Sequence, residues 1–182
     1  MKYYIKLGFI LLIFCAVASG ILAYINSLTA PVIAERKAKE EIATRESLIP
    51  DSDFEEQQAP GGEKYFIARD KATGDIKGYT FIAAQTGYSS VVQTMVGVDK
   101  EFNVINIKVI DQAETPGLGA NCTSESFTGQ FAGLPASELA VDKDGGKIKS
   151  LSGATITSRC VANSIREMVK ALQAAIADGG AK

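Results

Sequence analysis

The sequence predicts an α+β fold, in which an antiparallel sheet with flanking helices is preceded by one amino-terminal transmembrane helix. Three observations indicate this: an uncharged apolar stretch near the amino terminus, a central group of short β-rich runs, and an amphipathic pattern near the carboxyl terminus. Strands that are grouped, with helices before and after them, are typical of the α+β class. The 182 residues suit one domain with a sizeable core.

The first element is the stretch LGFILLIFCAVASGILAYI, which carries no charge. As a helix it spans roughly 28 Å at about 1.5 Å per residue, close to the thickness of the bilayer's hydrocarbon core. A cleaved signal peptide is the alternative, because residues 16–18 (Ala-Val-Ala) resemble a cleavage site. The apolar stretch continues well past them, so we predict an uncleaved anchor over residues 7–28.

The charges around this anchor do not fix its orientation, because basic residues follow it at positions 36, 37 and 39 and precede it at positions 2 and 6. Long domains are translocated with little regard to charge, and two lysines before an apolar run also form a start-transfer signal. We therefore expect residues 1–6 in the cytoplasm and the remainder on the extracytoplasmic face of the cell (inner) membrane.

Two segments connect the anchor to the strands. Residues 29–49 are rich in charge, include Ile33 and Leu48, and follow Pro31 closely, which predicts a juxtamembrane helix. Residues 50–62 are polar and acidic with prolines at positions 50 and 60, which predicts a loop. An extracytoplasmic domain is expected over residues 50–182.

Four runs rich in β-branched and aromatic residues predict the sheet, over residues 65–69, 78–84, 90–98 and 104–110. Turn formers separate them, which indicates antiparallel hairpins. A glycine- and proline-rich loop and a polar stretch follow. The last element is a helix over residues 158–177, in which apolar residues recur at spacings of three or four, at Val161, Ile165, Val169, Leu172 and Ile176.

Composition excludes several classes of function. The chain has no histidine, which removes Ser-His and Cys-His nucleophilic pairs and the usual zinc and non-haem iron ligand sets. A net charge of −2 argues against binding of nucleic acid. The cysteines, Cys15, Cys122 and Cys160, are too far apart for a CxxC pair or an iron–sulfur run. A disulfide between Cys122 and Cys160 stays open, and two buried thiols are the interpretation we favour. No metal site is predicted.

The segment SGATITS at residues 152–158 places four hydroxyls and a glycine at the entry to the last helix. Unpaired amides and the positive end of the helix dipole favour an anion there, and a phosphate is the natural guest. The alternative is that Thr157 or Ser158 only caps the helix, and the residues by themselves favour this alternative.

A resemblance changes that balance. The segment LSGATITSR resembles the flavinylation motif of the FMN-binding domain family, whose threonine, here Thr155, is esterified to the phosphate of FMN by a separate flavin transferase. Residues 87–89 (GYS), 96–99 (VGVD) and 114–119 (ETPGLG) resemble the other family signatures in the expected order. The resemblance covers nearly the whole chain. Within the family it is closest to G subunits of Rnf ion-translocating electron transport complexes, with C subunits of sodium-translocating NADH:quinone reductases similar but longer.

The resemblance implies a site for covalent FMN, with no catalytic residue of its own. The 114–119 loop is expected near the flavin ring, with Thr115 and Leu118 as side-chain contacts. One departure is Lys149, which stands where the family has Asp, and Arg159 could neutralise a phosphate or be solvated. The candidate cofactor-binding residues are Thr155, Ser152, Gly153, Ala154, Thr157, Ser158, Glu114, Thr115, Gly117, Leu118, Gly119 and Tyr88.

The function that the resemblance implies is a membrane-anchored electron carrier in a redox-driven ion pump of the ferredoxin:NAD oxidoreductase (Rnf) type. Its partners would be the other membrane subunits of the complex and, for maturation, the flavin transferase. The alternatives are a C subunit of a sodium-translocating NADH:quinone reductase, a free-standing extracytoplasmic flavoprotein, and a binding module without redox chemistry.

Overall fold

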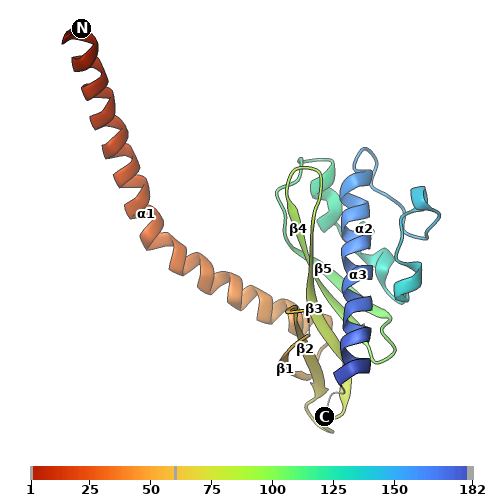
Figure 1. Ribbon diagram of the computed structural model, residues 1–182. Coiled ribbons are helices and arrows are strands. Elements are labelled where there is room, and N and C mark those ends of the chain that lie inside the picture. The colour runs from red at the N-terminus through yellow and green to blue at the C-terminus, as the bar shows by residue number, and fades with distance from the viewer. Residues whose placement is uncertain (1, 60, 180–182) are drawn as a thin grey trace. The chain divides into compact units, whose positions relative to one another are not determined.

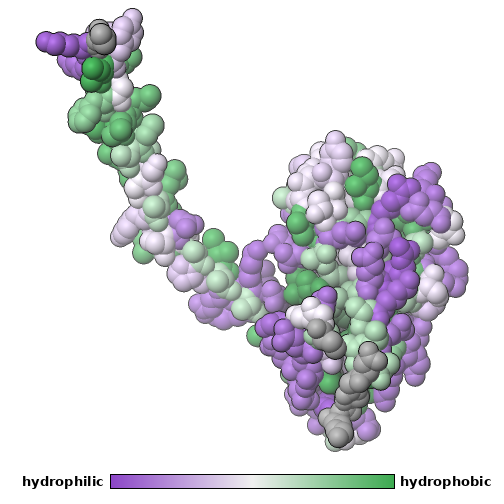
Figure 2. Space-filling view, viewed as in Figure 1, coloured by the Kyte–Doolittle hydropathy of each residue, from purple (hydrophilic) through white to green (hydrophobic). Residues whose placement is uncertain are grey.

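The computed structural model describes residues 2–59 and 61–179, which belong to two compact units, Met1–Ile42 and Ala43–Lys182. The first unit is formed by helix α1 (Lys2–Leu48), whose last residues belong to the second. Within the described residues, α1 is the one helix long and apolar enough to cross a membrane. Hydrophobic side chains gather around its amino-terminal half and hydrophilic ones become frequent towards its other end (Figure 2).

Helix α1 does not break at Pro31, which lies in its interior (Figure 1). A proline removes one backbone hydrogen bond from a helix, and here the turns on both sides keep theirs. Residues 29–48 thus continue the anchor helix, whereas a new helix after Pro31 was the sequence-based expectation. The boundary between anchor and juxtamembrane segment at residues 28 and 29 stays a prediction.

The second unit contains one five-stranded antiparallel sheet with the strand order β1-β2-β3-β4-β5. Each strand pairs with its neighbours in sequence, as in a meander (Figure 1). The last four strands confirm the four predicted runs. Their bounds, with that of the first, are Ser52–Gln58 (β1), Lys64–Asp70 (β2), Ile76–Thr86 (β3), Val91–Asp99 (β4) and Val104–Asp111 (β5).

Strand β1 corrects the prediction of a loop over residues 50–62, of which Pro60 lies outside the described residues. The strand pairs with β2 from Ser52 opposite Asp70 to Gln58 opposite Lys64. Its sequence, SDFEEQQ, is polar because an edge strand with mostly exposed side chains needs few apolar ones. Backbone pairing therefore forms this strand where side-chain hydropathy gives no signal.

One face of the sheet is covered by helix α3 (Thr155–Gly179), which packs against β3 and β4. The predicted apolar residues Val161, Ile165, Val169 and Leu172 are buried in this core with Phe81 and Val96. Short helices between β5 and α3 close the rest of it. Their bounds are Gly119–Thr123 (η1), Glu125–Thr128 (α2), Gly129–Phe131 (η2), Ala136–Glu138 (η3) and Asp142–Asp144 (η4).

Helix α3 begins three residues earlier than the predicted position 158. Thr157 and Ser158 therefore lie inside its first turn, and both are buried. Neither residue precedes the helix, so the capping role that the residues by themselves favoured does not apply to them.

The opposite face of the sheet is covered by the end of α1. Leu48 and Ile49 pack there against Ala68 and Met95. Arg45, which is 8% exposed, lies with its guanidinium carbon 3.5 Å from the centre of the Phe66 ring. A cation over an aromatic face is attracted by the ring quadrupole, most strongly where water is excluded. This contact fastens the last turn of α1 to strand β2.

The substitution Arg45→Ala removes this cation–π contact and should lower the free energy of unfolding by about 2 kcal/mol. Thermal unfolding of the detergent-solubilised protein, followed by circular dichroism, measures the change. Arg36→Ala is the matched control, because Arg36 is an exposed arginine of the same helix. Equal effects of the two substitutions would contradict the stabilising role of the Arg45 contact.

Candidate functional site

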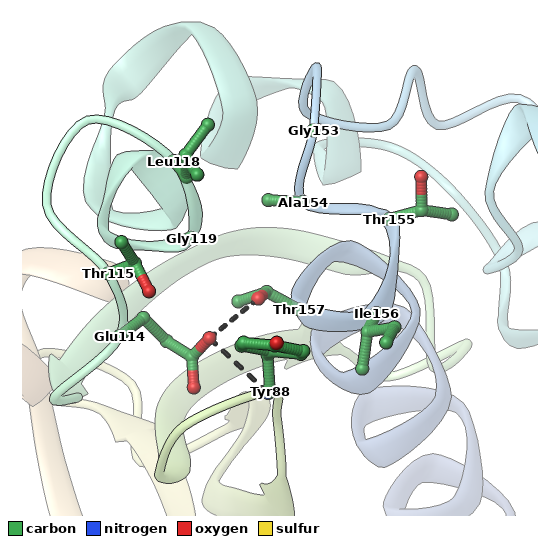
Figure 3. A pocket seen from close by; sticks show the side chains of 10 residues that line it. All are labelled: Tyr88, Glu114, Thr115, Leu118, Gly119, Gly153, Ala154, Thr155, Ile156 and Thr157. Carbon is green, nitrogen blue, oxygen red and sulfur yellow. Dashed lines mark hydrogen bonds between the residues drawn. The ribbon is translucent and has the colours of Figure 1, made fainter.

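A cavity of about 430 Å³ opens at the entry to α3. The 114–119 loop and the first turn of α3 face each other across it, with the turn after β3 below them (Figure 3). Cavities of this size are typical of sites for small molecules and cofactors. Its lining residues are Tyr88, Glu114, Thr115, Leu118, Gly119, Gly153, Ala154, Thr155, Ile156 and Thr157.

Most of the predicted site residues line this cavity, although they come from three separate segments. Ser152, Gly117 and Ser158 do not. The Ser158 hydroxyl is buried, where it donates to the Ala154 carbonyl (2.9 Å) and accepts from the Leu151 amide (2.9 Å). It therefore shapes the loop before α3 from within the core.

Ile156 also lines the cavity and was missed from the sequence. Half of its side chain is exposed, at 51%, as are the neighbouring Leu118 at 44% and Tyr88 at 72%. Because the residue lies inside the SGATITS segment, its position there was the signal that could have identified it. Together the three side chains form an apolar rim around a polar interior.

The carboxylate of Glu114 holds the three segments together. One oxygen accepts hydrogen bonds from the amides of Ser89 and Ser90, both at 2.9 Å, and from the Ser90 hydroxyl at 3.3 Å. The other oxygen accepts from the Thr157 hydroxyl at 2.7 Å and from the Tyr88 amide at 3.3 Å (Figure 3). The loop, the turn after β3 and the first turn of α3 thus meet at one side chain.

Glu114 is ionised although it is only 5% exposed. Burial raises the pKa of a carboxyl group, but the bonds from the Thr157 hydroxyl and from the amides of Ser89, Ser90 and Tyr88 outweigh this effect. The pKa of Glu114 therefore lies below its ordinary value. Hydrogen bonds to an ionised group are stronger than those between neutral groups.

Two glycines leave room for this carboxylate. A Cβ on Gly87 would lie 2.7 Å from one carboxylate oxygen, and a Cβ on Gly119 would lie 2.7 Å from the other. Both distances are too short for any side chain, so these glycines are required by the buried charge.

The entry to α3 is shaped for close approach of a ligand to the backbone. Gly153 has a φ of +74°, a conformation that favours glycine, and a Cβ there would lie 3.0 Å from Leu118. Thr155 is the first helical residue and is half-buried. The first amides of a helix lack partners within it, so this end of the cavity favours an anion.

Two charged residues near the motif are engaged elsewhere. Arg159 donates two hydrogen bonds to Asp144, at 2.6 and 2.7 Å, so its guanidinium is held by a carboxylate on η4. Lys149 is exposed and pairs through its backbone with the side chain of Gln130. Neither residue lines the cavity.

Cys122 and Cys160 are both buried and both unpaired, which confirms the interpretation as thiols. Burial, followed by the nearby Glu114 charge, raises the pKa of each thiol to about 11. Both cysteines are therefore protonated at neutral pH and unreactive.

Glu114→Gln should lower the free energy of unfolding by about 2 kcal/mol at neutral pH, because charge-assisted bonds are lost. A carboxyl whose pKa is lowered by folding stabilises the fold above its unfolded pKa, and this contribution disappears as pH falls through the folded value. The difference between wild type and variant should thus shrink as pH falls below 4.5, the ordinary value. Thermal unfolding across this range measures it.

Glu167→Gln, at an exposed position of α3, is the control and should change stability little at any pH. A stability loss for Glu114→Gln that stays constant down to strongly acid pH would contradict an ionised Glu114.

Family models match two parts of the chain. An FMN-binding domain model matches residues 87–170, which contain every residue of the cavity, and an RnfG N-terminal region model matches residues 2–48, the extent of α1. A crystal structure of the C subunit of the Na(+)-translocating NADH-quinone reductase from Parabacteroides distasonis has a similar fold. Its TM-score is 0.52 with 23% identity over 61% of each chain. This confirms the α+β fold class.

Similarity to characterised G subunits extends over most of the sequence. The chain is 33% identical over 163 residues to that of the proton-translocating ferredoxin:NAD(+) oxidoreductase complex of Clostridium ljungdahlii, which covers 88% of this chain and 86% of that protein. It is 32% identical over 195 residues to that of the Na(+)-translocating ferredoxin:NAD(+) oxidoreductase complex of Acetobacterium woodii, covering 94% and 93%. With both family models matched in order, the chain belongs to the family of Rnf complex G subunits.

Proposed function

We propose that this chain is the membrane-anchored electron-transfer subunit of an Rnf-type ion-translocating complex and carries FMN through a phosphoester to Thr155. The observation that carries the proposal is the position of Thr155. It is the first residue of α3 and lines a cavity whose walls all belong to the FMN-binding domain.

The residues of the cavity fit the parts of FMN. A phosphate on Thr155 lies beside the amino-terminal amides of α3, which favour an anion. Leu118, Tyr88 and Ile156 offer apolar surface for the ring, and Gly153 allows the backbone to come close. FMN, once bound, accepts and donates electrons singly or in pairs, so the protein need only hold and tune it.

Thr155 needs outside help to become attached. A threonine hydroxyl is a weak nucleophile without a base, the chain has no histidine, and the Glu114 carboxylate is bonded to Thr157. We propose that a flavin transferase supplies the base. The Thr155 oxygen attacks the phosphorus of the FMN half of FAD, the pyrophosphate bond breaks, AMP leaves, and the hydroxyl proton passes to the transferase.

The partners follow from the relatives. The Clostridium and Acetobacterium proteins are subunits of ferredoxin:NAD(+) oxidoreductase complexes, one translocating protons and the other Na⁺. We propose that the other membrane subunits of such a complex contact this chain, that α1 is its single membrane span, and that the flavin domain lies on the extracytoplasmic face. The RnfG N-terminal region match over α1 supports the anchor.

Thr155→Val should abolish covalent flavin, because the variant lacks the attacking oxygen. The protein is co-expressed with a flavin transferase, denatured and separated on a gel, and fluorescence under ultraviolet light is recorded. Thr123→Val is the matched control, since Thr123 is exposed and does not line the cavity. A fluorescent Thr155→Val band, or a wild-type band without fluorescence, would contradict the proposed attachment.

Orientation is tested with single cysteines in intact cells. Cys122 and Cys160 are buried thiols, so they contribute little background, and Cys15 lies within the proposed span. Lys143→Cys, in the exposed η4 segment, should react with a membrane-impermeant maleimide, whereas Lys2→Cys should react only after the cells are permeabilised. The reverse pattern would place the flavin domain in the cytoplasm.

A further inference from the structure

Glu114 is a buried charge without a balancing cation. Among the described residues no lysine or arginine forms an ion pair with it, and its partners are three amides and two hydroxyls. These dipoles hold the carboxylate in place and keep it ionised, but they do not cancel its charge. A fixed negative charge therefore forms part of the cavity wall.

The position of this charge is set rigidly. Gly87 and Gly119 fit around the two carboxylate oxygens, so the side chain cannot move without a change in the backbone. The Thr157 hydroxyl binds it from the first turn of α3, two residues from Thr155. A group attached at Thr155 and lying in the cavity is consequently held close to the carboxylate.

We propose that Glu114 is a positioning and tuning residue that lowers the reduction potential of the flavin in this cavity. The inference rests on the proposed function. Reduction adds negative charge to the ring system, and a nearby fixed negative charge in a partly dry site disfavours that addition. The same carboxylate therefore assembles the cavity and keeps its flavin a strong electron donor.

The test compares midpoint potentials of the flavin-loaded full-length protein, titrated with dithionite, which supplies the electrons and is itself oxidised. Glu114→Gln removes the charge and should favour the reduced flavin about tenfold, a shift of about 59 mV to more positive potential for a one-electron step. Glu114→Asp restores the charge and should return the potential most of the way to the wild-type value.

Thr157→Val separates charge from packing. It removes one hydrogen bond to the carboxylate and leaves the charge in place, with one dipole fewer to offset it. The potential should therefore move slightly to more negative values, opposite to Glu114→Gln. Thr94→Val is the matched control, because Thr94 is buried in β4, outside the cavity, and its hydroxyl has no partner among the described residues. It should leave the potential unchanged.

Loosening of the cavity alone would shift Glu114→Gln and Thr157→Val in the same direction, and that result would overturn the inference. A Glu114→Gln potential equal to that of wild type would also overturn it. Should Glu114→Gln carry no flavin, the sign of the Thr157→Val shift decides: a negative shift supports the inference and a positive shift overturns it. The covalent attachment is judged separately, by the fluorescent band of the wild-type protein.

Discussion

The site depends on one carboxylate that is withdrawn from water and satisfied by the backbone. Glu114 joins the end of β3, the loop after β5 and the start of α3, which are otherwise separate in the chain. Its burial costs free energy, and the amide and hydroxyl bonds offset that cost only while all three segments are in place. The two glycines beside it, Gly87 and Gly119, exist in that geometry because the carboxylate occupies the space of a side chain.

Much of the architecture could be predicted from local patterns. The period-2 runs of β2 to β5 and the apolar stripe of α3 bury one side each, so their hydropathy shows them. Strand β1 has no such pattern because pairing with β2 forms it, and Pro31 is a poor guide because neighbouring turns carry the helix past it. These features depend on backbone hydrogen bonds, which leave no trace in hydropathy.

The candidate site was predicted mainly from motifs, and the structure explains why the motifs lie so far apart. Residues 87–89, 114–119 and 152–158 contribute separate walls of one cavity. The sequence did not reveal that Ser158 faces the core, that Arg159 binds Asp144, or that Glu114 bonds to Thr157. Each of these depends on which side of a turn a residue occupies, and a three-residue shift in the start of α3 is enough to change it.

The order of elements along the chain has a consequence for biogenesis. All five strands pair with sequence neighbours, so the sheet needs only local contacts, which form quickly. Helix α3 follows every strand and supplies half of the core and one wall of the cavity. The proposed attachment point is therefore synthesised after the surface that receives the flavin, and the cavity closes only when α3 docks. Cofactor loading is thus a late event that can act as a quality check on the finished fold.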